Sequence, residues 1–128
     1  MDYPAPSPLQ QLLIDALAVV AADASDQTAW VDRHEVVVDE IALNFDDVFR
    51  MLEIPIEQRQ IDESVGDALR EIDTLFMIMS GQGNSDRWTR SALSSDKGWN
   101  QARRLARHVL IELTGRWDHP LPDIQVIR

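Results

Sequence analysis

The chain has 128 residues, contains no cysteine and carries a formal net charge of −10 at pH 7. The lack of cysteine excludes disulfide frameworks, thiolate zinc sites and cysteine nucleophiles, and this length is typical of one domain that folds without a metal. No apolar run approaches the ~18–20 residues of a membrane span, and the start MDYPAPSPLQ lacks the basic segment of a signal peptide. We therefore expect a single helical domain over residues 1–128 of a cytoplasmic protein, with no cofactor and no membrane partner.

The negative charge is concentrated in the first half of the chain. Residues 1–64 hold 14 Asp and Glu against 3 Arg, a net charge of −11, whereas residues 65–128 hold 8 acidic and 9 basic residues, a net charge of +1. Such a field repels nucleic acids and accelerates encounters with basic proteins. Solubility alone explains the excess equally well. The charge thus favours a basic protein partner over a nucleic acid.

The first predicted helix follows a short N-terminal arm, residues 1–7. Ser7 is a good N-cap, and Pro8 suits the first helical position because its missing N–H would be unpaired there in any case. Apolar residues then recur at helical spacing as far as Val20.

The second predicted helix begins at Asp26 or Thr28 and is the longest. One apolar stripe continues to Pro55, which we expect to end the helix because a residue before proline disfavours helical geometry. The β-branched residues 36–38 argue for a strand, but the longer helical period outweighs them because propensities differ by only about 0.7 kcal/mol per residue or less.

The third predicted helix begins after Asp62, a plausible N-cap, and its apolar stripe ends at Met79. Gly81 is expected to adopt the left-handed conformation that commonly follows a helix. The sequence GQGNSD then reads as a loop.

The last predicted elements are a short helix over residues 86–93 and a long helix that Asp96 caps and residues 114–115 end. The tail, residues 116–128, should run extended over the surface. We expect its apolar anchors to be Trp117, Leu121 and Ile124. The elements together predict an all-α protein: a compact bundle of four long amphipathic helices plus one short helix, with an extended C-terminal tail.

Motifs of common enzymes are missing from the sequence. A di-iron bundle needs Glu-x-x-His, but Val31 and Leu105 stand three residues before His34 and His108. His34 begins an H-E pair, yet Val38 occupies the position of the second zincin histidine. Neither a G-x-S-x-G motif nor a phosphate-binding loop is present. We therefore expect no catalytic residue.

One group of carboxylates leaves a metal site open. Glu63, Asp67 and Glu71 follow one helical face at four-residue steps, where like charges repel by a few tenths of a kcal/mol per pair, about 0.2–0.5. A divalent cation would relieve the repulsion, but water or Arg70 would do so as well. These three residues are weak candidate metal ligands, and a solvated helix face is the better explanation.

Positive charge gathers only in the last predicted helix. Arg103 and Arg107 lie one turn apart, with Arg104 further round the helix. Such residues can bind phosphate or single-stranded nucleic acid, with Trp99 stacking on a base. Pairing between the acidic and arginine-bearing halves of one bundle is the simpler explanation, and we favour it.

The acidic stretch DEIALNFDDVFRML, residues 39–52, carries the best indication of a binding surface. On the helix predicted there, two aliphatic residues fall among carboxylates on the side opposite the apolar stripe. An apolar centre with a charged rim resembles a protein–protein interface. Isolated exposed aliphatic residues are common, however, and another helix could cover this side. The candidate partner-binding residues are Asp32, Glu35, Val36, Asp39, Glu40, Leu43, Asp46 and Asp47.

Four sequence runs resemble small acidic helical proteins of bacterial genomes: DEIALNFDD, FMIMSG, RWTRSAL and GWNQARRLARHVL. Some of those proteins are similar to immunity partners of polymorphic toxins. The resemblance covers roughly residues 28–114, and its motifs are non-catalytic. It implies a protein that binds and blocks a toxin domain, but it assigns no functional residue.

These observations favour a non-enzymatic, acidic, helical protein-binding module, for example an inhibitor of a basic toxin or nuclease. Two alternatives remain open. One is a divalent-metal-dependent helical hydrolase that uses Glu63, Asp67 and Glu71. The other is a structural homodimer that pairs through Val36 and Leu43.

Overall fold

The computed structural model describes residues 3–123, which form helices joined by turns and contain no β-strand. The all-α prediction is confirmed. Over this range, none of the helices combines the length and apolar character needed to cross a lipid bilayer. The helices are α1 (Pro8–Ala21), α2 (Ala24–Arg33), α3 (Asp39–Glu57), α4 (Glu63–Met79), the 3-10 helix η1 (Ser85–Trp88), α5 (Ala92–Ser95) and α6 (Lys97–Thr114).

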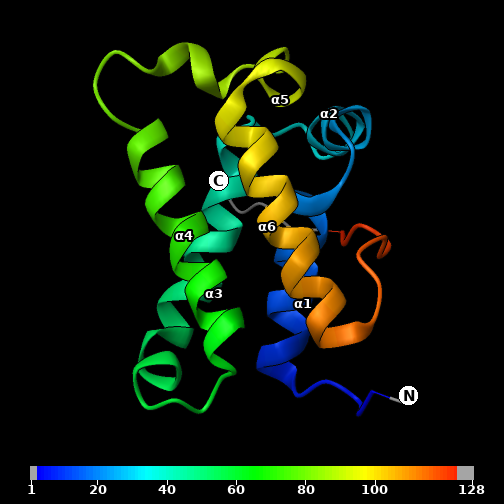
Figure 1. Ribbon diagram of the computed structural model, residues 1–128. Coiled ribbons are helices and arrows are strands. Elements are labelled where there is room, and N and C mark those ends of the chain that lie inside the picture. The colour runs from blue at the N-terminus through cyan, green and yellow to red at the C-terminus, as the bar shows by residue number, and fades with distance from the viewer. Residues whose placement is uncertain (1–2, 124–128) are drawn as a thin grey trace.

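The helices α1, α3, α4 and α6 form an up-down-up-down bundle (Figure 1). Both α1 and α4 contact α3 and α6, so the four helices close a ring in which neighbours run antiparallel. The short helices α2 and α5 contact each other at one end of this ring. The contact between α3 and α4 is the smallest of the four around the ring, so side chains from both helices can line a groove there.

Most helix ends lie where the sequence predicts them. Ser7 accepts a hydrogen bond from the backbone of Gln10, whose side chain accepts one from the backbone of Ser7, which completes a capping box. Asp62 and Asp96 cap α4 and α6 with their carboxylates. Gly115 ends α6 with a φ of 85°, a conformation that glycine adopts without steric cost.

The prediction of one long helix from residue 26 or 28 to Pro55 is wrong, because the chain breaks between α2 and α3. Glu35 adopts a positive φ of 53°, and the backbone N–H of Val36 donates to the carbonyl of Val31 at 3.0 Å, which closes the end of α2. Val38 is buried after the break. The β-branched residues 36–38 marked this point, and core packing of α2 and α3 in different directions outweighs the continuous stripe.

Pro55 does not end α3, contrary to the prediction. The helix continues to Glu57, and Ile56 is buried in the core. A proline in the last turn removes one backbone hydrogen bond, and the burial of Ile56 offsets that loss. Arg59, with a φ of 58°, then turns the chain toward α4.

Two predictions for the segment after α4 are also corrected. Gly81 is not left-handed, because Ser80 ends the helix with backbone bonds to preceding carbonyls; the positive φ of 85° belongs to Gly83 instead. The short helix predicted over residues 86–93 is divided into η1 and α5. Ala92 and Leu93 of this segment are buried in the core.

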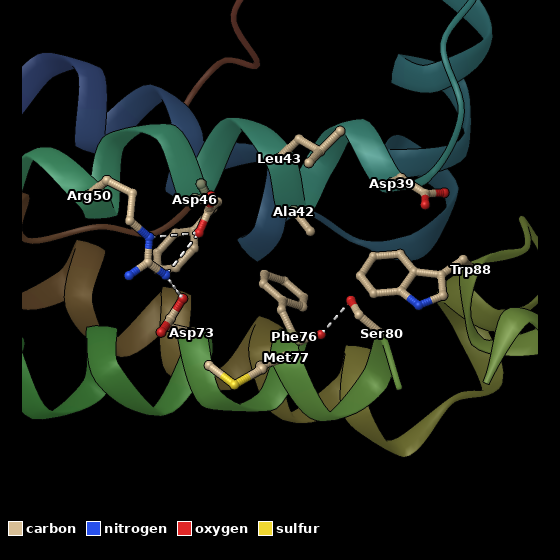
Figure 2. Close-up of a pocket in the computed structure, with 11 residues that line it drawn as sticks. Asp39, Ala42, Leu43, Asp46, Arg50, Asp73, Phe76, Met77, Ser80 and Trp88 are labelled. Atoms are coloured by element: carbon tan, nitrogen blue, oxygen red, sulfur yellow. Dashed lines mark hydrogen bonds and ion pairs between the residues drawn. The ribbon is translucent and has the colours of Figure 1, made fainter. Parts of the chain in front are cut away.

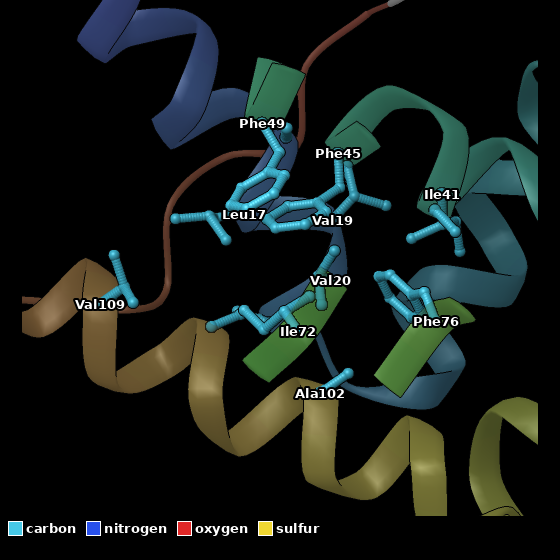
Figure 3. Packing of buried hydrophobic residues seen from close by; sticks show 14 of the residues in the cluster. Leu17, Val19, Val20, Ile41, Phe45, Phe49, Ile72, Phe76, Ala102 and Val109 are labelled. Carbon is cyan, nitrogen blue, oxygen red and sulfur yellow. The ribbon is translucent and has the colours of Figure 1, made fainter. Parts of the chain in front are cut away.

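The core lies inside the ring of four helices. Figure 3 shows Leu17 of α1, Phe45 of α3, Ile72 of α4 and Val109 of α6 among the side chains of this interior. Burial of one such side chain stabilises a fold by about 1.5–3 kcal/mol. Trp99 is fully buried in the same cluster, so its ring packs against the core and presents no face to a base.

Two of the α6 arginines bond inside the protein, but mainly to backbone carbonyls and only in part to the acidic residues with which the sequence predicts pairing. Arg103 donates from Nε to the carbonyl of Ala22 at 2.9 Å, and Arg107 donates from Nε to the carbonyl of Ala21 at 2.8 Å. Arg107 also forms an ion pair with Asp23. These positive groups therefore meet the C-terminal end of α1, where unpaired carbonyls concentrate negative charge.

Residues 116–123 fold back along one side of the bundle toward α2 (Figure 1). The ring of Trp117 lies against the guanidinium of Arg107 on α6, with 3.6 Å between the guanidinium carbon and the ring centroid. Trp30 of α2 donates from its indole to the carbonyl of Pro122 at 2.9 Å. Trp117 and Leu121 are half-buried anchors, as predicted. The third expected anchor, Ile124, lies outside the described residues.

Candidate functional site

A groove of about 330 Å³ lies between α3 and α4, beside Trp88 at the end of η1 (Figure 2). The antiparallel direction of the two helices pairs the start of α3 with the end of α4. Side chains of both acidic and apolar type line it. They are Asp39, Ala42, Leu43, Phe45, Asp46, Arg50, Asp73, Phe76, Met77, Ser80 and Trp88.

The floor of the groove belongs to the hydrophobic core. Phe45 and Phe76 are buried and meet edge to face, with ring centroids 6.0 Å apart. Trp88 continues this aromatic cluster and donates from its indole to the carbonyl of Met79 at 2.8 Å. Because each ring is held by packing or by a hydrogen bond, the floor is preformed.

Two flexible apolar side chains form the edges of the groove. Leu43 on α3 is 53% exposed and Met77 on α4 is 65% exposed, and they lie on opposite sides of the groove (Figure 2). Methionine adapts readily to an irregular partner surface because it is unbranched and polarizable. The groove therefore offers a rigid base with adaptable sides.

Carboxylates surround this apolar interior and outnumber the single cation that lines it. Arg50 donates from Nε to Asp46 at 3.0 Å, also pairs with Glu53 on its own helix, and reaches across to Asp73 on α4. Three acids thus share one guanidinium. Asp39 adds a further carboxylate at the other end of the groove (Figure 2).

Asp73 is the least exposed of these acids, with 18% of its side chain accessible. Desolvation raises the pKa of Asp73, and Arg50 opposes that rise, while Asp46 and Glu53 add to it. The charged form of Asp73 therefore depends on a nearby cation.

The predicted site residues divide between three locations. Asp39, Leu43 and Asp46 line the groove, whereas Glu40, in the first turn of α3, does not. Asp47 faces the other side of α3, where it lines a hollow with α1 and the tail.

The remaining predicted residues lie before α3. Asp32 is on α2 and pairs with Arg90 at 2.7 Å. Glu35 is in the turn after α2, and Val36 is half-buried against the core. The break between the helices therefore separates Val36 from Leu43, which the predicted continuous helix had placed on one side.

Sequence reasoning missed the half of the groove that α4 and its following loop supply: Asp73, Phe76, Met77 and Trp88. Met77 was the available signal, because it is a large apolar residue outside the apolar stripe of α4, as Leu43 is outside that of α3. The pairing of the two helices had no local signal.

The candidate metal ligands are exposed on α4. Glu63 and Asp67 border a polar hollow at the α3–α4 turn, and Glu71 borders a second hollow against α6, which Asp67 also lines. Within residues 3–123, the His, Asp and Glu side chains form no group of three or more that could hold a metal ion.

Comparisons with known proteins add no relative to this description. No protein-family model matches the chain, and neither a curated protein nor a solved structure does.

Proposed function

We propose that the protein is a non-enzymatic binding module whose α3–α4 groove receives a basic protein partner. The observation that carries this proposal is the groove itself: an apolar floor with exposed Leu43 and Met77 at its edges and an excess of carboxylates around it. An apolar centre within a polar rim is typical of interfaces between proteins. Inhibition of a basic toxin or nuclease is one function that such binding would serve.

The two kinds of side chain would contribute differently to binding. Residues 1–64 carry a net charge of −11. Their carboxylates would attract a basic protein from a distance and orient it, which mainly increases the association rate. Leu43 and Met77 would then lose contact with water against the partner, which slows dissociation.

Affinity capture from the source cell with wild type and Leu43→Arg tests the proposal. The captured protein is identified, expressed and measured by calorimetry. We expect Leu43→Arg to weaken its binding about tenfold or more, because a charged side chain at the apolar edge is costly to desolvate. Ile111→Arg is the matched control, because Ile111 is 47% exposed on α6 and does not line the groove.

Equal recovery of every captured protein by wild type and Leu43→Arg would contradict the proposal. So would a captured partner without a basic surface. Circular dichroism of both variants should show unchanged helix content, since both positions are exposed.

A further inference from the structure

The shape of the α3–α4 groove restricts what can occupy it. On α3 the lining residues recur every three or four positions from Asp39 to Arg50, so the groove follows the helix axis. At about 1.5 Å per residue this side is roughly 16 Å long, or about three helical turns. The opposite wall, from Asp73 to Ser80 on α4, runs antiparallel to it (Figure 2).

The charges lie at the two ends of the groove, with the apolar surface between them. Asp39 marks one end, and Asp46 together with Asp73 marks the other (Figure 2). Asp39 and Asp46 belong to one helix, which places them about 10 Å apart along its axis. Ala42 and Phe76 lie between these ends.

We infer that the groove binds an amphipathic cationic helix of the partner, with basic residues seven positions apart and an aliphatic side chain between them. This inference rests on the proposed function and specifies the chemistry of the partner. Two basic residues at that spacing lie on one helix face, about 10 Å apart, and match the two acidic ends. An aliphatic residue three or four positions along would lie over Ala42 and Phe76, between Leu43 and Met77.

A helix fits this site better than an extended strand. Two helices form the walls, and the described residues contain no strand whose edge an extended peptide could extend. An amphipathic helix in an apolar groove between helices is a common mode of recognition, and it uses anchors at the spacing inferred above.

Arg50 shows that one end of the groove accommodates a guanidinium. Its side chain spans from Asp46 on α3 to Asp73 on α4, the position that a basic residue of the partner would share. Because Arg50 already neutralises part of this cluster, it competes with an incoming cation. Its removal should therefore strengthen binding, a result that damage to the fold would not produce.

Designed peptides test the inference without the natural partner. The probe is an alanine-rich helical peptide of about 15 residues, long enough for a stable helix, with Lys at positions i and i+7 and Leu at i+3 and i+4. A second peptide of the same composition places both Lys opposite the Leu residues. A third peptide carries Glu in place of Lys. Calorimetry at low ionic strength gives the affinity of each, and we expect binding by the first alone.

Variants of the protein locate the binding site. Met77→Gln should weaken binding of the first peptide about fivefold, and Arg50→Gln should strengthen it about threefold. Ile111→Gln, a change of similar size on α6, should leave the affinity within about twofold. If Met77→Gln lowers the helix content, Leu43→Gln replaces it, since Leu43 occupies the opposite edge of the groove.

Equal affinity for the first two peptides, or for wild type and Met77→Gln, would overturn the inference. A dimer in light scattering that Met77→Gln dissociates would also overturn it, because a second copy would then fill the groove. If no peptide binds, but Leu43→Arg still weakens the binding of a captured basic protein, the proposed function stands and only the inferred helical occupant is wrong. If both experiments fail, both proposals are wrong.

Discussion

Arg103 joins three segments that are distant in the sequence. Besides the carbonyl of Ala22, its guanidinium donates to the carbonyl of Leu93 at 2.7 Å and to the side chain of Gln27 at 2.8 Å. Gln27 is fully buried, and its amide donates to two carbonyls at the end of α1. Burial and the positive charge of Arg107 lower the pKa of Arg103, but arginine remains charged at neutral pH.

Replacement of Arg103 by Met should destabilise the protein by about 2–4 kcal/mol. The change leaves buried acceptors on Ala22, Leu93 and Gln27 without their donor, and an unpaired buried polar group is costly. Urea unfolding followed by circular dichroism measures the loss. Arg104→Met is the control, since Arg104 is exposed and bonds to Gln101 on its own helix; its effect should stay within about 0.5 kcal/mol. A loss of similar size in both variants would refute this account of Arg103.

Charge pattern predicted part of this residue-level result. The distribution of acidic and basic residues indicated that the arginines of the last helix pair with the acidic half: Arg107 does so through Asp23, whereas Arg103 bonds to carbonyls and to Gln27. The acceptors could not be predicted, because backbone carbonyls leave no mark in the sequence and the proximity of α1 to α6 is a tertiary property. The exposure of Leu43 was left open by the sequence, because another helix could have covered that side of α3; in the structure its side chain is exposed.

At the level of elements, Asp96 shows how one side chain can fix a helix start. Its carboxylate accepts from the backbone N–H of Gly98 at 2.6 Å and also receives two hydrogen bonds from Arg87. The bond from Arg87, followed by that from Gly98, lowers the pKa of Asp96 despite partial burial. The negative charge also suits the N-terminal end of α6.

Two substitutions should separate the cap from the charge. Asp96→Asn keeps an acceptor for the cap but loses the ion pair, whereas Asp96→Ala loses both and should cost about 1–2 kcal/mol at pH 7. Because the folded pKa lies below the unfolded value near 3.9, the charge stabilises the protein fully above that value. The stabilisation is lost as the pH falls through the folded pKa.

Unfolding experiments between pH 7 and pH 2 check this sign. The difference in unfolding free energy between wild type and Asp96→Asn should be constant near neutrality and shrink toward zero in acid. A difference that grows as the pH falls would contradict the assigned role of the ion pair with Arg87.

Helix ends were predicted where side chains make the cap, as at Ser7, Asp62 and Asp96. The break before α3 was not predicted, because Glu35 adopts a left-handed conformation that no glycine or asparagine indicates in the sequence. The β-branched residues 36–38 argued for a strand rather than a break, and the longer helical period outweighed them. Tertiary packing decided both this break and the continuation of α3 through Pro55.

At the level of the whole molecule, the helical period and the positions of the loops were enough to predict an all-α bundle of four long helices. The groove was only half predictable. Residues on α3 were identifiable from the sequence, but their partners on α4 depend on which helices become neighbours, and no short-range pattern encodes that choice.

The uneven charge predicts opposite effects of salt on stability and on binding. The net charge of −11 on residues 1–64 exceeds what the arginines can neutralise. Repulsion among the carboxylates therefore opposes the compact folded state. An increase in NaCl from about 0.01 M to about 0.1 M shortens the Debye length from about 30 Å to about 10 Å. Screening should then raise the thermal midpoint by several degrees, which corresponds to about 1 kcal/mol.

The same screening should weaken the binding of the cationic probe peptide, because the attraction between this peptide and the groove is also electrostatic. A triple variant with amides at the exposed positions Asp47, Asp67 and Glu71 serves as the control for stability. It carries less repulsion, so its midpoint should start higher and respond less to salt. A wild-type midpoint that falls with added salt would mean that attractive ion pairs such as Arg107–Asp23 outweigh the repulsion. The acidic half would then owe its stability to the arginines of α6, whatever partner it attracts.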